Sequence, residues 1–116
     1  MTITRQYRQG HVLVQPVSAI PPDAVAVAPK RPGVVVIAEG ESGREHHFKG
    51  DRVSLFQSHG DLYFSVSELN DADGEPIPVV LDHPEHGPIE LYPGDYLVIE
   101  QREADPITRA VRDSFD

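Results

Sequence analysis

Histidine is the residue type with which this sequence has the clearest means to do chemistry. Two short segments each contain it twice, His46-His47 and His83-Pro84-Glu85-His86. Neutral imidazole is the commonest metal ligand in proteins, and two or three imidazoles with a carboxylate suit zinc, iron, manganese or nickel. The pattern therefore predicts one divalent transition metal ion bound by His46, His83, His86 and Glu85.

Other side chains near these segments have candidate roles. Glu45 or Glu41 could supply the carboxylate in place of Glu85. Adjacent residues of a strand point to opposite faces, so at most one of His46 and His47 faces inward. The residues predicted to bind or orient a ligand rather than a metal are His47, Arg44 and Tyr96.

The alternative interpretation is that these histidines are surface or hydrogen-bonding side chains without a ligand. On this interpretation the metal site does not exist, and the acidic loops simply place imidazoles in solvent. His11 is expected to be a strand residue with no role, and His59 a solvated residue of a hairpin loop. Both interpretations remain open at this point.

The sequence contains no common catalytic motif. It has no Walker-type glycine loop, no Gly-x-Ser-x-Gly elbow and no His-Glu-x-x-His pair. The turn with Asp71, Asp73 and Glu75 lacks the further ligands and the terminal glutamate of a calcium loop. Whether the protein is an enzyme is left open.

Composition limits the class of protein. The 116 residues include no cysteine and have a net charge of −9. This length suits one domain over residues 1–116. A strongly acidic chain repels phosphate backbones and anionic lipids, so no nucleic-acid or membrane partner is expected. The absence of cysteine, of a signal peptide and of a long apolar run predicts a cytoplasmic location.

Short apolar runs separated by proline and glycine predict a mainly β fold, a small barrel or sandwich of the jelly-roll type. The expected strands lie within residues 9–17, 24–28, 33–38, 45–48, 52–57, 62–67, 76–81, 89–91 and 96–102, with a hairpin loop at 58–61. Residues 1–7 are expected to be flexible. Asp105-Pro106 and the spacing of Ile107, Val111 and Phe115 predict one short helix within residues 105–115.

Four segments resemble a family of small uncharacterised β-rich proteins of bacteria and phages. They are Arg8-Gln9-Gly10-His11-Val12-Leu13, Gly43-Arg44-Glu45-His46, His83-Pro84-Glu85-His86-Gly87-Pro88-Ile89, and the stretch from Pro93-Gly94-Asp95-Tyr96 to Glu103. The resemblance spans most of the chain and implies a shared fold without implying an activity. Arg44 stands where the family has the first histidine of the central segment.

A second resemblance is to the cupins. Gly40, five residues and His46, followed later by Gly87, five residues and Pro93-Gly94, are similar to the skeleton of the two cupin motifs. Phe48 replaces the second histidine of the first motif, and no histidine follows Gly94. The resemblance implies a metal site in a β-barrel.

Three functional hypotheses follow. The favoured one is a non-catalytic binding or assembly module whose partner is another copy of itself or another protein, joined through an edge strand or the C-terminal helix. The alternative is a cupin-like metal-binding protein or metalloenzyme that acts on a small molecule through the histidines. The third is an interaction that responds to pH through histidine protonation.

Overall fold

The computed structural model describes residues 6–40 and 43–101, and this part of the chain is built from strands. Their bounds are β1 Tyr7–Gln9, β2 Val12–Val17, β3 Val25–Val27, β4 Val34–Glu39, β5 Glu45–Lys49, β6 Val53–Ser58, β7 Asp61–Val66, β8 Val79–Leu81, β9 Ile89–Leu91 and β10 Gly94–Glu100. The predicted mainly β fold is confirmed. The helix predicted within residues 105–115 lies outside the described residues.

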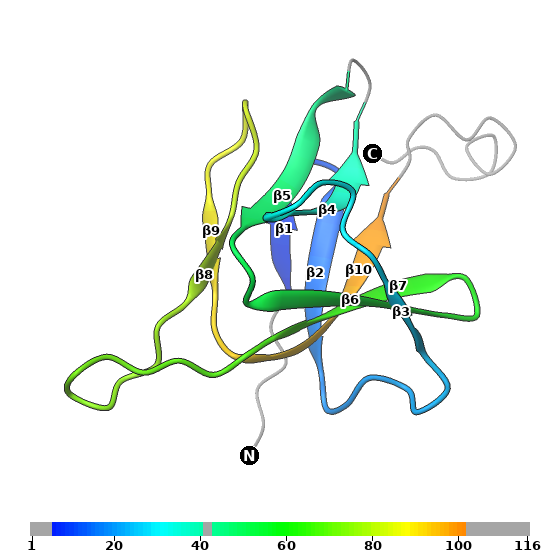
Figure 1. Cartoon of the computed structure of the whole chain (residues 1–116). Helices are drawn as coiled ribbons and strands as arrows, with labels where there is room; N and C mark the ends of the chain where they lie inside the picture. Colours follow the sequence, from blue (N-terminus) through cyan, green and yellow to red (C-terminus); the bar gives the residue numbers. More distant parts are fainter. Residues whose placement is uncertain (1–5, 41–42, 102–116) are drawn as a thin grey trace, which may run out of the picture.

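Six strands form the main sheet, in the order β1-β2-β10-β7-β6-β3, and each neighbouring pair is antiparallel (Figure 1). β1 and β3 are the terminal strands of this sheet. They do not pair with each other, so the described strands do not close into the barrel that the sequence allowed.

The remaining strands form two hairpins, β4–β5 and β8–β9. The backbones of His47 and Asp82 join them, since each residue donates its N–H to the other's carbonyl, at 3.0 and 2.8 Å. This bridge places the central histidine segment next to the start of the loop between β8 and β9.

Alternating residues of the strands build one hydrophobic core. In β5, His46 and Phe48 are buried while Lys49 is exposed, and in β2 Val12 and Val14 are buried. The Phe48 ring lies 5.1 Å from the Phe64 ring, measured between ring centres. An imidazole therefore occupies a position in β5 that period-two alternation directs inward, next to an aromatic core residue.

Two-residue turns close two of the hairpins. Ser58 pairs with Asp61 around His59 and Gly60, which both have positive φ angles, as a type I′ turn requires. This confirms the predicted hairpin loop. The strand expected within residues 9–17 is present as β2, and a turn at Gly10 and His11 separates it from β1, which the sequence did not predict.

Within residues 6–40 and 43–101, no helix is long and apolar enough to cross a membrane.

Candidate functional site

Four histidine side chains from three separate segments lie together, and we call His11, His46, His83 and His86 the histidine cluster. The ring centres of His46 and His83 are 4.3 Å apart, those of His83 and His86 4.6 Å, and those of His11 and His46 5.2 Å. His46 and His86 stack at 6.4 Å, with an interplanar angle of 9°. The structure thus brings together three of the predicted metal ligands and one histidine for which no role was predicted.

Each segment reaches the cluster for a local reason. His46 points inward because it alternates along β5 with the partly buried Glu45 and His47, whose side chains point to the opposite face. His83 and His86 lie in the loop between β8 and β9, whose two prolines, Pro84 and Pro88, each lack a backbone N–H to donate to a sheet. His11 follows Gly10 in the turn between β1 and β2. Gly10 has a φ of +60°, a conformation that glycine adopts without steric cost.

Gln9 connects two of these segments. It is 2% exposed, and its amide Nε2 donates to the carbonyl oxygens of Leu81 and Gly87, both at 2.9 Å. These carbonyls flank the loop that contains His83 and His86. Oε1 of Gln9 lies 2.8 Å from Nδ1 of His46. One side chain therefore holds both ends of the loop and orients His46.

The Gln9 contacts fix the tautomer of His46. Because Nε2 of Gln9 is the group that faces the two carbonyls, its Oε1 faces His46 and can only accept a hydrogen bond. Nδ1 of His46 is therefore the protonated nitrogen, and Nε2 carries a lone pair when the ring is neutral. This Nε2 is buried and has no hydrogen-bond partner in the described part of the chain.

His46 is held in the neutral form. Its side chain is fully buried, and burial, together with the nearby His83 and His11 rings, lowers the pKa of His46 to about 4. Burial also lowers the pKa of His83, and the neighbouring His86 adds to this effect. A neutral imidazole is the form that binds a metal ion.

His83 is engaged differently from His46. Its Nδ1 accepts hydrogen bonds from the backbone N–H groups of Glu85, at 3.0 Å, and His86, at 3.2 Å. This arrangement caps the turn that begins at His83. Glu85, the predicted carboxylate ligand, forms an exposed ion pair with Arg44 at 3.1 Å. Arg44 therefore lies beside the loop that contains His83 and His86.

Gly10 packs directly against the ring of His86. A Cβ atom added to Gly10 would lie 2.6 Å from Nε2 of His86, closer than real Cβ contacts. His11 lies next to Gly40, and its Nε2 is 3.8 Å from Oε1 of Glu100. The turn between β1 and β2 thus borders the cluster with two residues, Gly10 and His11.

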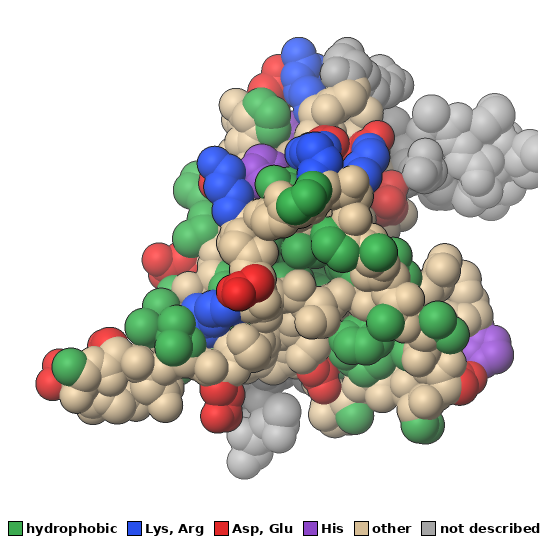
Figure 2. Space-filling view, in the orientation of Figure 1, with side chains coloured by type: hydrophobic (Ala, Val, Ile, Leu, Met, Phe, Trp, Pro, Cys, Tyr) green, Lys and Arg blue, Asp and Glu red, His purple; other side chains and the backbone are tan. Residues whose placement is uncertain are grey.

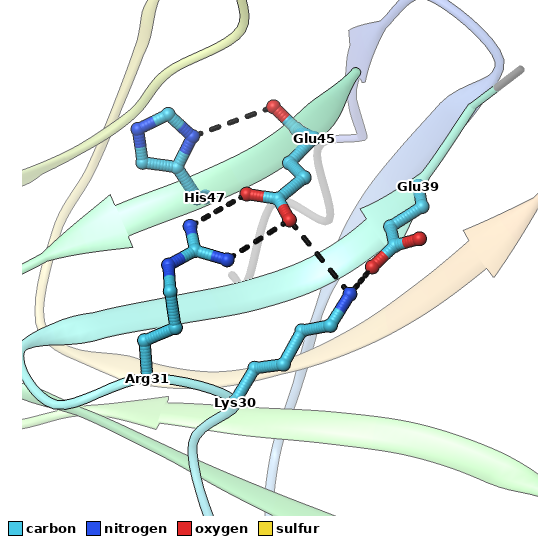
Figure 3. Close-up of polar contacts among 5 residues, drawn as sticks. All are labelled: Lys30, Arg31, Glu39, Glu45 and His47. Carbon is cyan, nitrogen blue, oxygen red and sulfur yellow. Dashed lines mark hydrogen bonds and ion pairs between the residues drawn. The ribbon is translucent and has the colours of Figure 1, made fainter. Parts of the chain in front are cut away.

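Two other predicted binding residues lie elsewhere. His47 points to the opposite face of β5, where its Nδ1 donates to the backbone oxygen of Glu45 at 3.4 Å (Figure 3). Tyr96 is buried in the core, stacks on Phe64 at 5.0 Å and donates its hydroxyl to the carbonyl of Tyr92 at 2.6 Å. Burial raises the pKa of Tyr96 to about 12.

The face that carries His47 is closed by ion pairs. Arg31 contacts both carboxylate oxygens of Glu45, at 2.7 and 3.1 Å, and Lys30 pairs with Glu39 (Figure 3). Figure 2 shows basic and acidic side chains close together over this part of the molecule, with hydrophobic side chains below them. The charges on this face are therefore already matched within the chain.

Two shallow apolar hollows lie between β3, β4 and β6, with volumes of about 190 and 310 Å³. They share Val27 and Leu55, and no histidine lines either. They are therefore separate features from the histidine cluster.

In the arrangement seen, no three His, Asp or Glu side chains of residues 6–40 and 43–101 are placed to hold one metal ion. The rings pack against one another, His46 with His86 stacked and the other pairs tilted or edge-to-face. Metal binding at this cluster therefore requires side chains to turn.

A family model described as a domain of unknown function, DUF8820, matches residues 8–101. The chain belongs to this family. The DUF8820 match begins in β1 and includes Gln9, the turn with His11, His46 and the whole loop of His83 and His86. All members of the histidine cluster are thus part of the family domain. Comparison with curated proteins and with solved structures gave no match.

Sequence reasoning missed Gln9, Gly10 and His11. A glycine at the first position of a two-residue turn between apolar segments is the signal that predicts the hairpin at Gly10. The role of Gln9 has no such local signal, because its partners lie 37, 72 and 78 positions away.

Proposed function

We propose that this protein is a non-catalytic binding module whose ligand is one divalent transition metal ion, held at the histidine cluster. The observation that supports the proposal is the Nε2 atom of His46, which is buried, has no hydrogen-bond partner among residues 6–40 and 43–101, and carries a lone pair. A buried acceptor without a partner costs about 1–3 kcal/mol, which a bound cation would offset.

The surroundings of His46 suit a metal ligand. Metal-binding histidines regularly donate their other ring N–H to a carbonyl or carboxylate, which fixes the tautomer and the ring orientation. Gln9 supplies such a group, at 2.8 Å from Nδ1. The same glutamine is tied to the loop that holds His83 and His86, so it places the ligands relative to one another.

The spacing of the rings is also close to that of a metal site. Two imidazoles that share one tetrahedral zinc at about 2.0–2.1 Å have ring centres roughly 5 Å apart. The separations of 4.3, 4.6 and 5.2 Å in the cluster lie near this value. His83 and His86 lie in a loop, so their rings are able to turn toward an ion on His46 without movement of a strand.

The donor set indicates the class of ion. Imidazole nitrogens with one carboxylate suit zinc, iron, manganese or nickel, and the absence of cysteine excludes a thiolate site. Glu85 can supply the carboxylate when it leaves Arg44. The net charge of −9 attracts cations in general and repels nucleic acids and anionic membranes.

The test is metal binding by the tag-free protein, measured by titration calorimetry and elemental analysis. Wild-type protein is expected to bind about one zinc or nickel ion per chain, and His46→Gln to bind at least about tenfold more weakly. His59→Asn is the matched control, because His59 lies in the β6–β7 turn and contacts Asp23 instead. Less than about a tenth of an ion per wild-type chain, or equal binding by His46→Gln, would contradict the proposal.

Assembly through an edge strand is the second candidate. β3 ends the main sheet, and Val25 within it is 67% exposed. An exposed apolar residue on a sheet edge favours pairing with another chain. Sedimentation velocity tests this: wild-type protein is expected to form a dimer that Val25→Lys dissociates, and a monomer at all concentrations would contradict it.

We also propose a more specific description of the fold. A cupin-like sandwich, in which the main sheet faces the sheet formed by the two bridged hairpins, is consistent with the core residues shared between them. A metal ion in such a fold would lie between the β1–β2 turn and the β8–β9 loop.

A further inference from the structure

We call the part of the β8–β9 loop from His83 to His86 the loop tip. The hydrogen bonds accepted by His83 and the Arg44–Glu85 ion pair both restrain it. On the assumption that the metal-binding function proposed above is correct, we infer that His83 acts as a switch. In the metal-free protein it caps the loop tip, and a metal ion on His46 draws its ring away and rearranges the tip.

Both ring nitrogens of His83 are occupied in the structure. Nδ1 accepts two backbone N–H groups, from Glu85 and His86. A neutral ring whose Nδ1 accepts hydrogen bonds carries its proton on Nε2. The cap must therefore break before His83 binds a metal ion, either through the freed Nδ1 or, once the proton has moved from Nε2 to Nδ1, through Nε2.

His83 lies close to both of the other two rings. Its ring centre is 4.3 Å from that of His46 and 4.6 Å from that of His86, whereas the centres of His46 and His86 are 6.4 Å apart. The three ring centres form a triangle, so an ion that binds Nε2 of His46 together with His86 lies beside the His83 ring. A nitrogen of His83 binds such an ion only after the ring leaves its cap.

The rearrangement that follows the movement of His83 is confined to the loop tip, because the two ends of the loop are held by hydrogen bonds. Gln9 binds the carbonyls of Leu81 and Gly87, and Asp82 exchanges two backbone hydrogen bonds with His47. The tip is held by the His83 cap, by the packing of His86 against Gly10 and by the Arg44–Glu85 ion pair. An exposed ion pair of this kind contributes little to stability, so the cap is the main restraint that the metal removes.

Metal binding thereby changes the surface of the protein at the loop tip. When His83 turns, the N–H groups of Glu85 and His86 lose their acceptor and Glu85 is freed from Arg44 to approach the ion. The shape and the charge of the loop tip then differ between the metal-free and the metal-bound protein. The protein is thereby able to report the presence of the ion to a partner that contacts this loop.

A single substitution separates the two roles of His83. Asparagine accepts hydrogen bonds from the N–H groups two and three residues later, as it does at the first position of many turns. His83→Asn thus retains the cap and removes the imidazole. Because the side chain lies in a loop and outside the hydrophobic core, the variant is expected to fold.

The experiment is a zinc chloride titration of ¹⁵N-labelled full-length protein, followed by backbone amide NMR and hydrogen exchange, with calorimetry on the same samples. In the wild type, the amides of Glu85 and His86 are expected to shift and to lose protection as zinc saturates, while those of His47 and Asp82 keep theirs. In His83→Asn, the amides of residues 85 and 86 are expected to stay protected at zinc saturation.

The outcomes distinguish this inference from the function on which it rests. Zinc binding by calorimetry with unchanged protection at Glu85 and His86 overturns the switch and leaves the metal site standing. The same holds if His83→Asn responds like the wild type. No zinc binding by the wild type overturns both.

Discussion

Oε1 of Gln9 lies 2.8 Å from Nδ1 of His46, although the two residues are 37 positions apart in the sequence. The contact gives His46 one tautomer and leaves its second nitrogen buried and without a partner among the described residues. The same amide holds both ends of the loop that contains His83 and His86. If the proposed metal site is correct, Gln9 couples the stability of the fold to metal binding.

Gln9→Leu is expected to lower the free energy of unfolding by about 3 kcal/mol, because it leaves Nδ1–H of His46 and two carbonyl oxygens without partners. Urea unfolding measures this. Gln6→Leu is the control, since Gln6 is exposed and its bond to Gln15 lies on the surface. Equal effects of the two substitutions would contradict the role assigned to Gln9.

Gly10→Ala is expected to weaken zinc binding about tenfold, because its Cβ would displace the ring of His86. Gly33→Ala is the matched control: Gly33 has a similar positive φ, +74°, and no atom within 4 Å of the added Cβ. Both substitutions cost about 1–2 kcal/mol through backbone strain. Calorimetry should find weaker zinc binding only in Gly10→Ala, and a similar loss in Gly33→Ala would exclude the contact as its cause.

The metal-free protein is expected to lose stability as the pH falls from 6.5 toward 4. Burial lowers the pKa of His46 from 6.5 to about 4, so below pH 6.5 the unfolded chain takes up a proton that the folded chain does not. By linkage, the loss levels off near pH 4 at no more than about 3 kcal/mol. This loss of stability is absent above pH 6.5, because the His46 ring is then neutral in both the folded and the unfolded protein.

Unfolding of wild type and His46→Gln at a series of pH values isolates this contribution. The difference between their free energies of unfolding should shrink as the pH falls, because only the wild type loses the effect. A difference that stays constant from pH 7.5 to about 4 would show that His46 titrates normally.

Tyr96→Phe is expected to leave zinc binding unchanged and to destabilise the protein by about 1 kcal/mol, through loss of the hydrogen bond to Tyr92. This tests the sequence-based prediction that Tyr96 orients a ligand, because its hydroxyl instead donates to the carbonyl of Tyr92. Loss of zinc affinity without loss of stability would instead indicate that Tyr96 contributes to zinc binding.

The strands were predictable where one face is buried and a turn residue follows. In β7 the alternation from Leu62 to Val66 indicates one buried face, and His59-Gly60 closes the hairpin as expected. β1 was missed because residues 7–9 are mostly polar and contain no apolar run that would indicate a strand. The closed barrel was not found because β1 and β3, the ends of the main sheet, do not pair with each other.

The candidate site was predictable in its residue types and not in its geometry. His46, His83 and His86 are visible from their spacing, and the structure places their rings together. His11 was overlooked because its approach depends on the turn at Gly10. The tautomer of His46 depends on Gln9, whose contacts are all long-range, so no local pattern reveals it.

The central claim is that Nε2 of His46 is the free, metal-binding nitrogen. Long-range ¹H–¹⁵N correlation of the imidazole side chains, with and without zinc, tests it most directly. We predict a neutral His46 with its proton on Nδ1 at pH 7, and a zinc-induced shift of Nε2 while the Nδ1 proton is retained. A His46 protonated on Nε2, or an Nε2 resonance that zinc leaves unchanged, would contradict the account.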